Sequence, residues 1–312
     1  MSNAREKRKE IHSLTPLLPY SPTPHSPLPT PCSLFLCCLL SALCSCSSPP
    51  KNSGYKYDTR NDAEVQLEMG NRQADRGGYD TALVFINEAV RLAVITDDPG
   101  LLVRARLSLG NAHFSQGNTE TAFESWNRAL EEAELAGNRE LAAVCRVHIA
   151  RGKLLSPGGK DAAQAIRNEL TRDLAQIKSD KRYVAFAWIV IGLAEKEMGR
   201  YAAAEEAVKR ALAIHEKARS FDLAASDWFM IASFRSLSGN SGGALKALES
   251  AIEYDRRTEN SWGLANDWQA VGDVQRKAGN HDAARAAYRR ASEIFRAVGN
   301  GEAAERALAR GE

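Results

Sequence analysis

The side chains best suited to chemistry do not have the spacing of a nucleotide site. The segment SPGGK at 156–160 contains a Gly-Lys pair, as a phosphate-binding loop does. Such a loop also needs a glycine five residues before that pair and a Ser or Thr after the lysine. Leu154 and Asp161 stand at these two places. We therefore expect no nucleotide site here.

The histidines and carboxylates are equally dispersed. His113, His148, His215 and His281 lie far apart in the sequence, and no two are spaced as metal ligands on one helix. No Ser, Thr or Cys stands in a recognisable nucleophile motif. The sequence predicts a protein that is not an enzyme and carries neither a metal nor a cofactor. An enzyme with a site hidden between helices stays open as an alternative, and it would need several perturbed titratable groups in one pocket.

The cysteines are concentrated near the N-terminus. Five of the six lie between Cys32 and Cys46, and only Cys145 lies in the body of the chain. This distribution excludes a disulfide framework for the body, and the spacing without interleaved histidine excludes a zinc site. Cys145, between Val144 and Val147 in an apolar stretch, is predicted to be a small buried side chain.

The charge of the chain is nearly balanced. The formal net charge is +2, and residues 1–46 account for all of it, so the remainder is neutral. A nucleic-acid-binding protein needs an excess of basic residues, which this chain lacks. We expect no nucleic-acid partner.

The first sixty residues differ in composition from the rest. Seven prolines lie between Pro16 and Pro31, which excludes a helix there. The apolar run from Ser33 to Leu43 is too short for a membrane span, which needs ~20 residues, but suits a secretory signal. Residues 47–60 are polar and contain Pro, Ser and Gly, so they are predicted to be a flexible tether.

The end of the apolar run, LCSC, resembles the lipobox of bacterial lipoproteins. The resemblance assigns Leu43 as the recognition leucine, Ser45 as the residue before cleavage and Cys46 as the lipidated first residue. It implies that 1–46 is a leader containing a lipoprotein signal. The protein would then be lipid-anchored in a bacterial cell envelope, at the outer membrane if the host is Gram-negative. The alternative is a disordered leader on a cytoplasmic protein.

The body of the chain repeats one pattern about every forty residues. A small residue marks the first helix of each repeat, a second one follows twelve residues later, and tryptophan precedes the first in three repeats. The first set is Gly70, Gly110, Ala150, Gly192, Ala232 and Gly272; the second is Ala82, Ala122, Ala204, Ala244 and Ala284; the tryptophans are Trp188, Trp228 and Trp268. A fixed period predicts stacked repeats, in which small residues let two helices approach closely.

These residues resemble the tetratricopeptide repeat family, in its long-repeat form. The resemblance implies an all-α fold: after a disordered leader, a right-handed superhelical α-solenoid of about six helix-turn-helix repeats over 61–300. The repeats are expected at about 62–99, 102–139, 142–180, 184–221, 224–261 and 264–300, with a capping helix at 301–312. The Pro-Gly-Gly at 157–159 predicts a longer turn in the third repeat.

The resemblance also implies a function. First helices of this family line a concave groove that binds peptides or proteins, so we expect an interaction scaffold with an unidentified protein or peptide partner. Candidate groove residues are Asn71, Arg104, Asn111, Phe114, Arg151, Leu193, Lys196, Ser233 and Asp273. Members that clamp a C-terminal carboxylate use a lysine where Leu67 and Leu107 stand, so we expect no such clamp. A cytoplasmic regulator or sensor acting on a signalling or transcription protein is the alternative.

Overall fold

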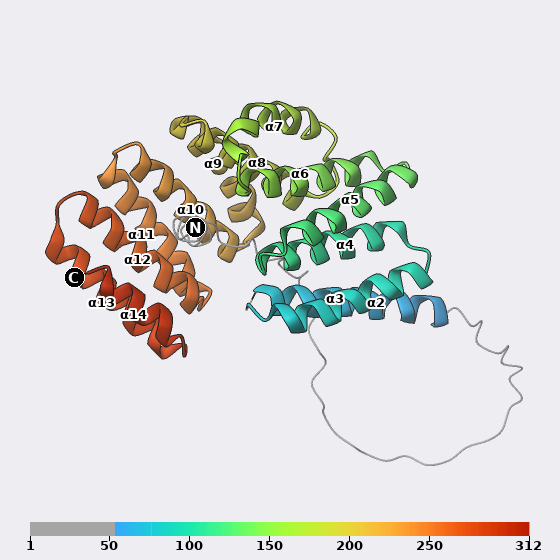
Figure 1. The fold of residues 1–312 in the computed structure, drawn as a ribbon, viewed down its shortest axis with the longest axis horizontal. Helices are drawn as coiled ribbons and strands as arrows, with labels where there is room; N and C mark the ends of the chain where they lie inside the picture. The colour runs from blue at the N-terminus through green and yellow to red at the C-terminus, as the bar shows by residue number, and fades with distance from the viewer. Residues whose placement is uncertain (1–53, 76, 312) are drawn as a thin grey trace, which may run out of the picture.

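The computed structural model describes residues 54–75 and 77–311, and side chains from Asp58 onward (Figure 1). The described residues form helices only, so the predicted all-α fold is confirmed. The helices are α2 (Gly54–Asp75), α3 (Tyr79–Ile95), α4 (Pro99–Ser115), α5 (Thr119–Leu135), α6 (Arg139–Leu155), α7 (Gly159–Asp173), α8 (Lys181–Glu197), α9 (Tyr201–Ala218), α10 (Phe221–Leu237), α11 (Ser241–Arg257), α12 (Ser261–Lys277), α13 (His281–Ala297) and α14 (Gly301–Ala309).

Short polar turns define where these helices start. Asp98, Asn138, Asn260 and Asn300 each accept a hydrogen bond from the backbone N–H three residues later, as an N-cap does. Gly279, just before the start of α13, has φ of +82°, a conformation that costs glycine little. Such turns reverse the chain after about seventeen residues, so consecutive helices lie antiparallel.

Within a repeat, the first small residue faces a large one. A Cβ added at Gly110 would lie 2.3 Å from Nε1 of Trp126, and one added at Gly272 would lie 2.5 Å from the ring of Tyr288. Gly70 and Gly192 are crowded in the same way by Ile86 and Val208. Each glycine therefore accommodates a side chain of the second helix that would otherwise hold the two helices apart.

The alanines of the pattern are buried. The second set, Ala82, Ala122, Ala204, Ala244 and Ala284, is at most 2% exposed, as is Ala232 of the first set. The three tryptophans lie half-buried, with the guanidinium of Arg210 over Trp188 at 4.4 Å and that of Arg290 over Trp268 at 5.1 Å. Trp228 packs against the main core. The aromatic rings thus fill space at the repeat surface while the alanines form its interior.

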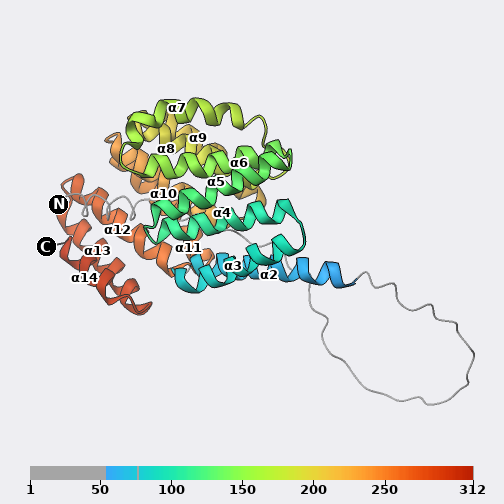
Figure 2. The ribbon, with the colours of Figure 1, turned by 45° about the vertical axis from the view of Figure 1, so that its right-hand side comes forward.

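The repeats stack into an arc. Figures 1 and 2 show α2–α5 and α10–α14 as its two arms, joined by α6–α9. One apolar core runs through the middle of the array from Val103 to Val274. At the C-terminal end, α14 covers the last repeat: Ala303, Ala304 and Ala307 pack with Phe295 of α13. A stacked array needs such a cover because its terminal repeat has no further neighbour.

Two predicted boundaries need correction. Helix α2 begins at Gly54, so the second half of the predicted tether at 47–60 is helical. The ion pair between Arg60 and Asp98, 2.9 Å long, ties this segment to the start of α4. The turn containing Pro157 is no longer than others, since α6 ends at Leu155 and α7 begins at Gly159. The additional residues lie instead after α7, at 174–180.

The predicted leader and its lipidation site at Cys46 lie outside the described residues. Within the described ranges, no helix is both long enough and apolar enough to cross a membrane.

Candidate functional site

The first helix of each repeat lines the concave side of the arc. Successive first helices contact one another directly: α2 contacts α4, α4 contacts α6, and α6 contacts α8. Second helices such as α5 and α7 have far fewer contacts with each other. In a curved array, the elements on the inner side are closer together. Side chains projecting from α2, α4, α6, α8, α10 and α12 therefore form the inner surface.

In each first helix, one residue directly follows the small residue of the repeat pattern. We call these six residues, which form a series across the inner surface, the inner row. Its members, one per first helix, are Asn71, Asn111, Arg151, Leu193, Ser233 and Asp273. All six were predicted to lie in the groove. The three N-terminal members are all polar, and two of them, Asn71 and Arg151, are buried.

Asn71 and Arg151 are both buried, Asn71 with an unpaired donor and Arg151 without a counter-charge. Asn71, on α2, is 7% exposed, and its Nδ2 has no hydrogen-bond partner. Arg151, on α6, is 8% exposed and forms no ion pair with any described carboxylate. Its Cζ lies 5.8 Å from the ring centroid of Phe114 on α4. A buried polar group without a partner costs free energy, and a ligand could supply an acceptor for Asn71 and a counter-charge for Arg151.

Asn111 lies between these two and contacts a histidine of the next repeat. Nδ1 of His148 is 3.0 Å from Oδ1 of Asn111. Burial, aided by the charge of Arg151, lowers the pKa of His148 to about 3, so the ring is neutral. Because the amide oxygen only accepts, Nδ1 carries the hydrogen. The ring centroids of His148 and of Phe186, on α8, lie 4.6 Å apart.

Other predicted groove residues are already engaged. Asp273 accepts hydrogen bonds from Tyr288 Oη at 2.7 Å and from Arg310 at 2.9 Å, so it joins α12 to the C-terminal cap. Arg104 forms an ion pair with Glu64 of the preceding repeat. These contacts engage Asp273 and Arg104 within the array, which reduces their availability to a partner.

The remaining candidates are apolar or weakly polar. Leu193 is 5% exposed and belongs to the apolar core, while Ser233 is half-buried. Lys196 lies 3.3 Å from the neighbouring Glu197. Phe114 is 7% exposed and stacks near Trp126 with centroids 5.5 Å apart. The structure thus places Arg151 against Phe114 and Asn111 against His148.

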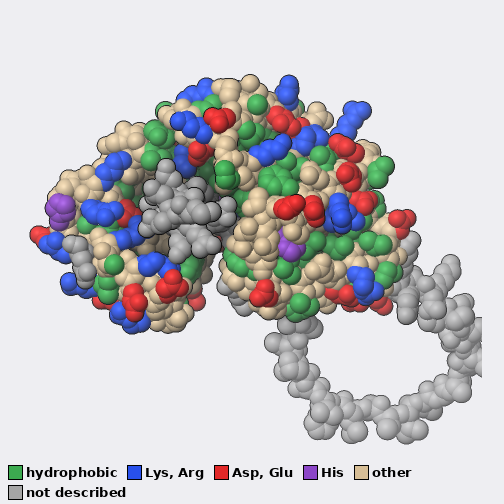
Figure 3. Space-filling view, in the orientation of Figure 1, with side chains coloured by type: hydrophobic (Ala, Val, Ile, Leu, Met, Phe, Trp, Pro, Cys, Tyr) green, Lys and Arg blue, Asp and Glu red, His purple; other side chains and the backbone are tan. Residues whose placement is uncertain are grey.

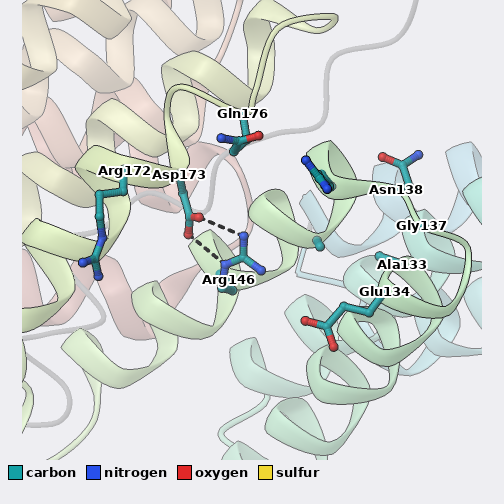
Figure 4. Close-up of a pocket in the computed structure, with 10 residues that line it drawn as sticks. Ala133, Glu134, Gly137, Asn138, Arg146, Arg172, Asp173 and Gln176 are labelled. Atoms are coloured by element: carbon teal, nitrogen blue, oxygen red, sulfur yellow. Dashed lines mark hydrogen bonds and ion pairs between the residues drawn. The ribbon is translucent and has the colours of Figure 1, made fainter.

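A separate recess lies at the edge of the array. It has a volume of about 590 Å³ and is lined by the α5–α6 turn, α6 and the end of α7 (Figure 4). The guanidinium of Arg146 donates to both carboxylate oxygens of Asp173, at 2.8 and 2.9 Å. Since these two charges satisfy each other, the recess contains no group that requires a ligand.

Two buried titratable pairs connect adjacent repeats. Nδ1 of His215 lies 2.6 Å from Oδ2 of Asp227, and burial raises the pKa of Asp227 to about 6. Forty residues later in the sequence, Asp255 and Asp267 occupy the same two positions and share a hydrogen bond. Burial and the neighbouring carboxyl raise the pKa of Asp267 to about 9. At neutral pH this second pair therefore holds a shared proton.

Sequence reasoning missed His148, Phe186 and the two buried pairs as residues with special environments. For the two pairs the sequence did contain a signal, because titratable residues stand at repeat positions where the first junction has Ala93 and Ala105. No comparable signal marked His148. In the described part of the chain, no group of three or more His, Cys, Asp or Glu side chains could hold a metal ion.

Comparison with known proteins supports the fold class. The tetratricopeptide repeat family model matches residues 187–217 and 268–297, each covering a first helix and its following second helix wholly or in part. No curated relative matches the sequence. The chain therefore contains tetratricopeptide repeats and has a tetratricopeptide-like α-solenoid fold.

Solved structures with the same fold cover most of the chain at low identity. A Rap protein complexed with competence and sporulation factor has a TM-score of 0.57 and 16% identity, covering 80% of this chain and 73% of that one. The Rap conjugation gene regulator of plasmid pLS20, with its Phr* peptide, has a TM-score of 0.57, 15% identity and coverages of 85% and 76%. PilW, a type IV pilus biogenesis factor, has a TM-score of 0.51, 18% identity and coverages of 79% and 98%.

Proposed function

We propose that this protein is a non-catalytic scaffold that binds a peptide or protein partner on its concave face. The observation that carries the proposal lies in the inner row: Nδ2 of the buried Asn71 has no hydrogen-bond partner, and the buried Arg151 has no ion pair with a described carboxylate. A surface that only packs repeats together would be apolar or internally satisfied there. Two similar solved structures are complexes, one with competence and sporulation factor and one with the Phr* peptide, which adds support from the fold alone.

The partner is not a polyanion. Acidic and basic side chains are interspersed over the face seen in Figure 3, and residues 47–312 are formally neutral. Charge interspersed in this way does not attract nucleic acid at long range. The exposed large apolar side chains are scattered over both kinds of helix, such as Met69 on α2, Val84 on α3, Leu135 on α5 and Trp262 on α12. These features favour a partner that has both polar and apolar groups and that is held by short-range contacts in the groove.

Blocking the groove tests this assignment. Peptides selected from a random library on the full-length protein would be measured against Asn111→Trp, which places a large side chain in the inner row. The matched control is Glu124→Trp, on the exposed side of α5 in the same repeat. We expect binding to be lost in Asn111→Trp alone. Equal binding by both variants and the wild type would refute a concave site.

We further propose that the array, with long repeats of about forty residues, is exported and lipid-anchored at Cys46. The LCSC segment at 43–46 and the apolar run before it support this proposal. A lipoprotein cysteine with several acyl chains would anchor stably, whereas a single chain gives only reversible binding. With Ser47 after the lipidated residue, the site would be the outer membrane in a Gram-negative host.

Fatty-acid labelling in the native host, with fractionation, tests the anchor. Label on the wild type in the membrane fraction, and none on Cys46→Ala, is the expected result. An unlabelled, soluble chain with its leader intact would instead favour a cytoplasmic regulator. That alternative draws support from the basic residues Arg5 to Lys9, which lie more than twenty residues before the apolar run.

A further inference from the structure

We propose that the N-terminal end of the array is a dimer interface, at which α2 of one copy packs antiparallel against α2 of a second copy. The interface is centred on four exposed side chains of α2, which we call the end stripe: Asp62, Val65, Met69 and Arg72. The end stripe lies on a different side of α2 from the buried Asn71 of the inner row. The inference is therefore independent of the concave site and concerns another surface of the molecule.

The spacing of the end stripe makes it one continuous seam. Its members follow one another at intervals of three, four and three residues, which keeps them on one face of an α-helix. The same alternation of three and four places side chains at the contact between two paired helices. Val65 and Met69, in the middle of the seam, are 51% and 39% exposed. The end stripe therefore has the geometry for packing against another helix, with apolar side chains at its centre.

The next repeat shows how this face of a first helix is normally covered. Forty residues later, on α4, the residues at the same positions are Leu102, Ala105, Leu109 and Ala112. They pack with apolar residues of α3, the second helix of the preceding repeat, and three of the four are at most 8% exposed. Figure 1 shows α2 and α3 at the outer end of the N-terminal arm. Within the described chain no helix precedes α2, so no described helix covers its end stripe.

The charges of the end stripe fit a second copy of the same helix. A two-fold axis that crosses the stripe midway between Val65 and Met69 places each of these residues opposite the other in the second copy. The same axis places Asp62 of each copy opposite Arg72 of the other, whereas a parallel pair would place like charges together. Arg72 also pairs with Glu68 of its own helix, but a guanidinium has five N–H donors and can serve both carboxylates.

The available area fits a reversible dimer. Helix α2 has 22 residues and is therefore about 33 Å long, and with α3 beside it the end of the array is roughly 20 Å wide. Pairing two such faces buries on the order of 500 Å² per copy, or about 1,000 Å² in total, which is the lower limit for a specific interface. At the opposite end α14 covers the last repeat, so the pairing closes at two copies and does not continue as a filament.

Cysteine cross-linking of the full-length protein in its native host tests the contact. Val65→Cys is compared with Leu135→Cys, which lies on α5, outside the end stripe, at a position that is 85% exposed. Cells are treated with a short, membrane-permeant bismaleimide, and the cross-linked dimer is measured by immunoblotting. The unsubstituted protein gives the background, to which the buried Cys145 should add little. We expect several-fold more dimer from Val65→Cys than from Leu135→Cys, and equal yields would overturn the inference.

An exchange of charges tests the antiparallel arrangement. In the Val65→Cys protein, Asp62→Arg or Arg72→Asp alone places like charges opposite each other and should lower the dimer yield several-fold. The two substitutions together restore opposite charges and should restore the yield. The matched exchange of Glu124→Arg with Arg128→Asp, on the exposed side of α5, should have no effect. No loss in the single variants, or no recovery in the combined one, would overturn the inference, and unchanged melting temperatures verify that each variant is folded.

Two results of the same experiment would assign the end stripe to another occupant. A cross-link from Val65→Cys to a different protein, without a homodimer, would replace the second copy by that protein. A Val65→Cys thiol that does not react with a monofunctional maleimide would show that another segment of this chain covers the stripe. Either result overturns the inference. Asn111→Trp, which blocks the concave groove, should leave the Val65→Cys dimer unchanged, so failure of the proposed groove function and failure of the dimer are distinguishable.

Discussion

The shared proton of Asp255 and Asp267 predicts a specific pH dependence of stability. The two carboxyls are 4% and 2% exposed, and the amide of Asn260 donates to Asp255 at 3.0 Å. Burial raises the pKa of Asp267 to about 9, far above its value in an unfolded chain. Between the pKa of Asp267 in the unfolded chain and its pKa in the folded protein, the folded protein holds one more proton than the unfolded one. Its stability therefore falls as the pH rises through this window.

Asp267→Asn removes this titration and keeps the shape of the side chain. The new amide can donate to Asp255 and replace the shared proton. One proton of difference changes the free energy of unfolding by about 1.4 kcal/mol per pH unit. Relative to the wild type, the variant should therefore gain stability as the pH rises from 5 to 8. At pH 5 the two proteins should differ least.

Urea unfolding at several pH values, followed by tryptophan fluorescence, measures this difference. Trp262 and Trp268 lie on α12 with Asp267, so the signal reports on the affected repeat. Asp161→Asn, at an exposed aspartate of α7, serves as the control and should show a flat difference over the same range. A difference for Asp267→Asn that does not change with pH would refute the shared proton.

Two further predictions concern backbone packing and can be checked by urea unfolding. Gly110→Ala should lower the free energy of unfolding by roughly 1–3 kcal/mol, because the added Cβ would overlap Trp126. The control Gly242→Ala, with open space around it, should be neutral or stabilising. Equal effects of the two substitutions would contradict the close approach of α4 and α5. Glu259 has φ of +55°, so Glu259→Gly should stabilise by up to about 1 kcal/mol, while Glu253→Gly inside α11 should destabilise by about 1 kcal/mol. A loss of stability in Glu259→Gly would show that the contacts of the Glu259 side chain stabilise the fold by more than its positive φ costs.

Much of the fold was predictable because its determinants are local and repeated. A glycine in the first helix, as at Gly110 or Gly272, and an alanine twelve residues later indicate two closely packed helices without knowledge of the rest. The all-α solenoid predicted from this pattern is confirmed. The start of α2 was missed, because local composition at 54–60 indicated a tether while contacts with α4 stabilise a helix there.

The candidate site was predictable only in outline. The repeat register placed Asn71, Arg151 and Asp273 on the inner side, but it treated them as equivalent. In the structure, Asp273 is engaged by Arg310, thirty-seven residues away, while Arg151 has no counter-charge. Whether a polar side chain is satisfied depends on groups from other repeats, and these are brought near only by the stacking of helices.

By itself, the sequence determined the helices, the turns between them and the small residues at which they meet, since each depends on neighbours within one repeat. Only the tertiary structure decided which charges are compensated. It buries Asp255 against Asp267 and leaves Arg151 beside Phe114 without a carboxylate. The physical reason is that desolvation and pairing depend on distances across repeat junctions, and the curvature of the stacked array sets those distances.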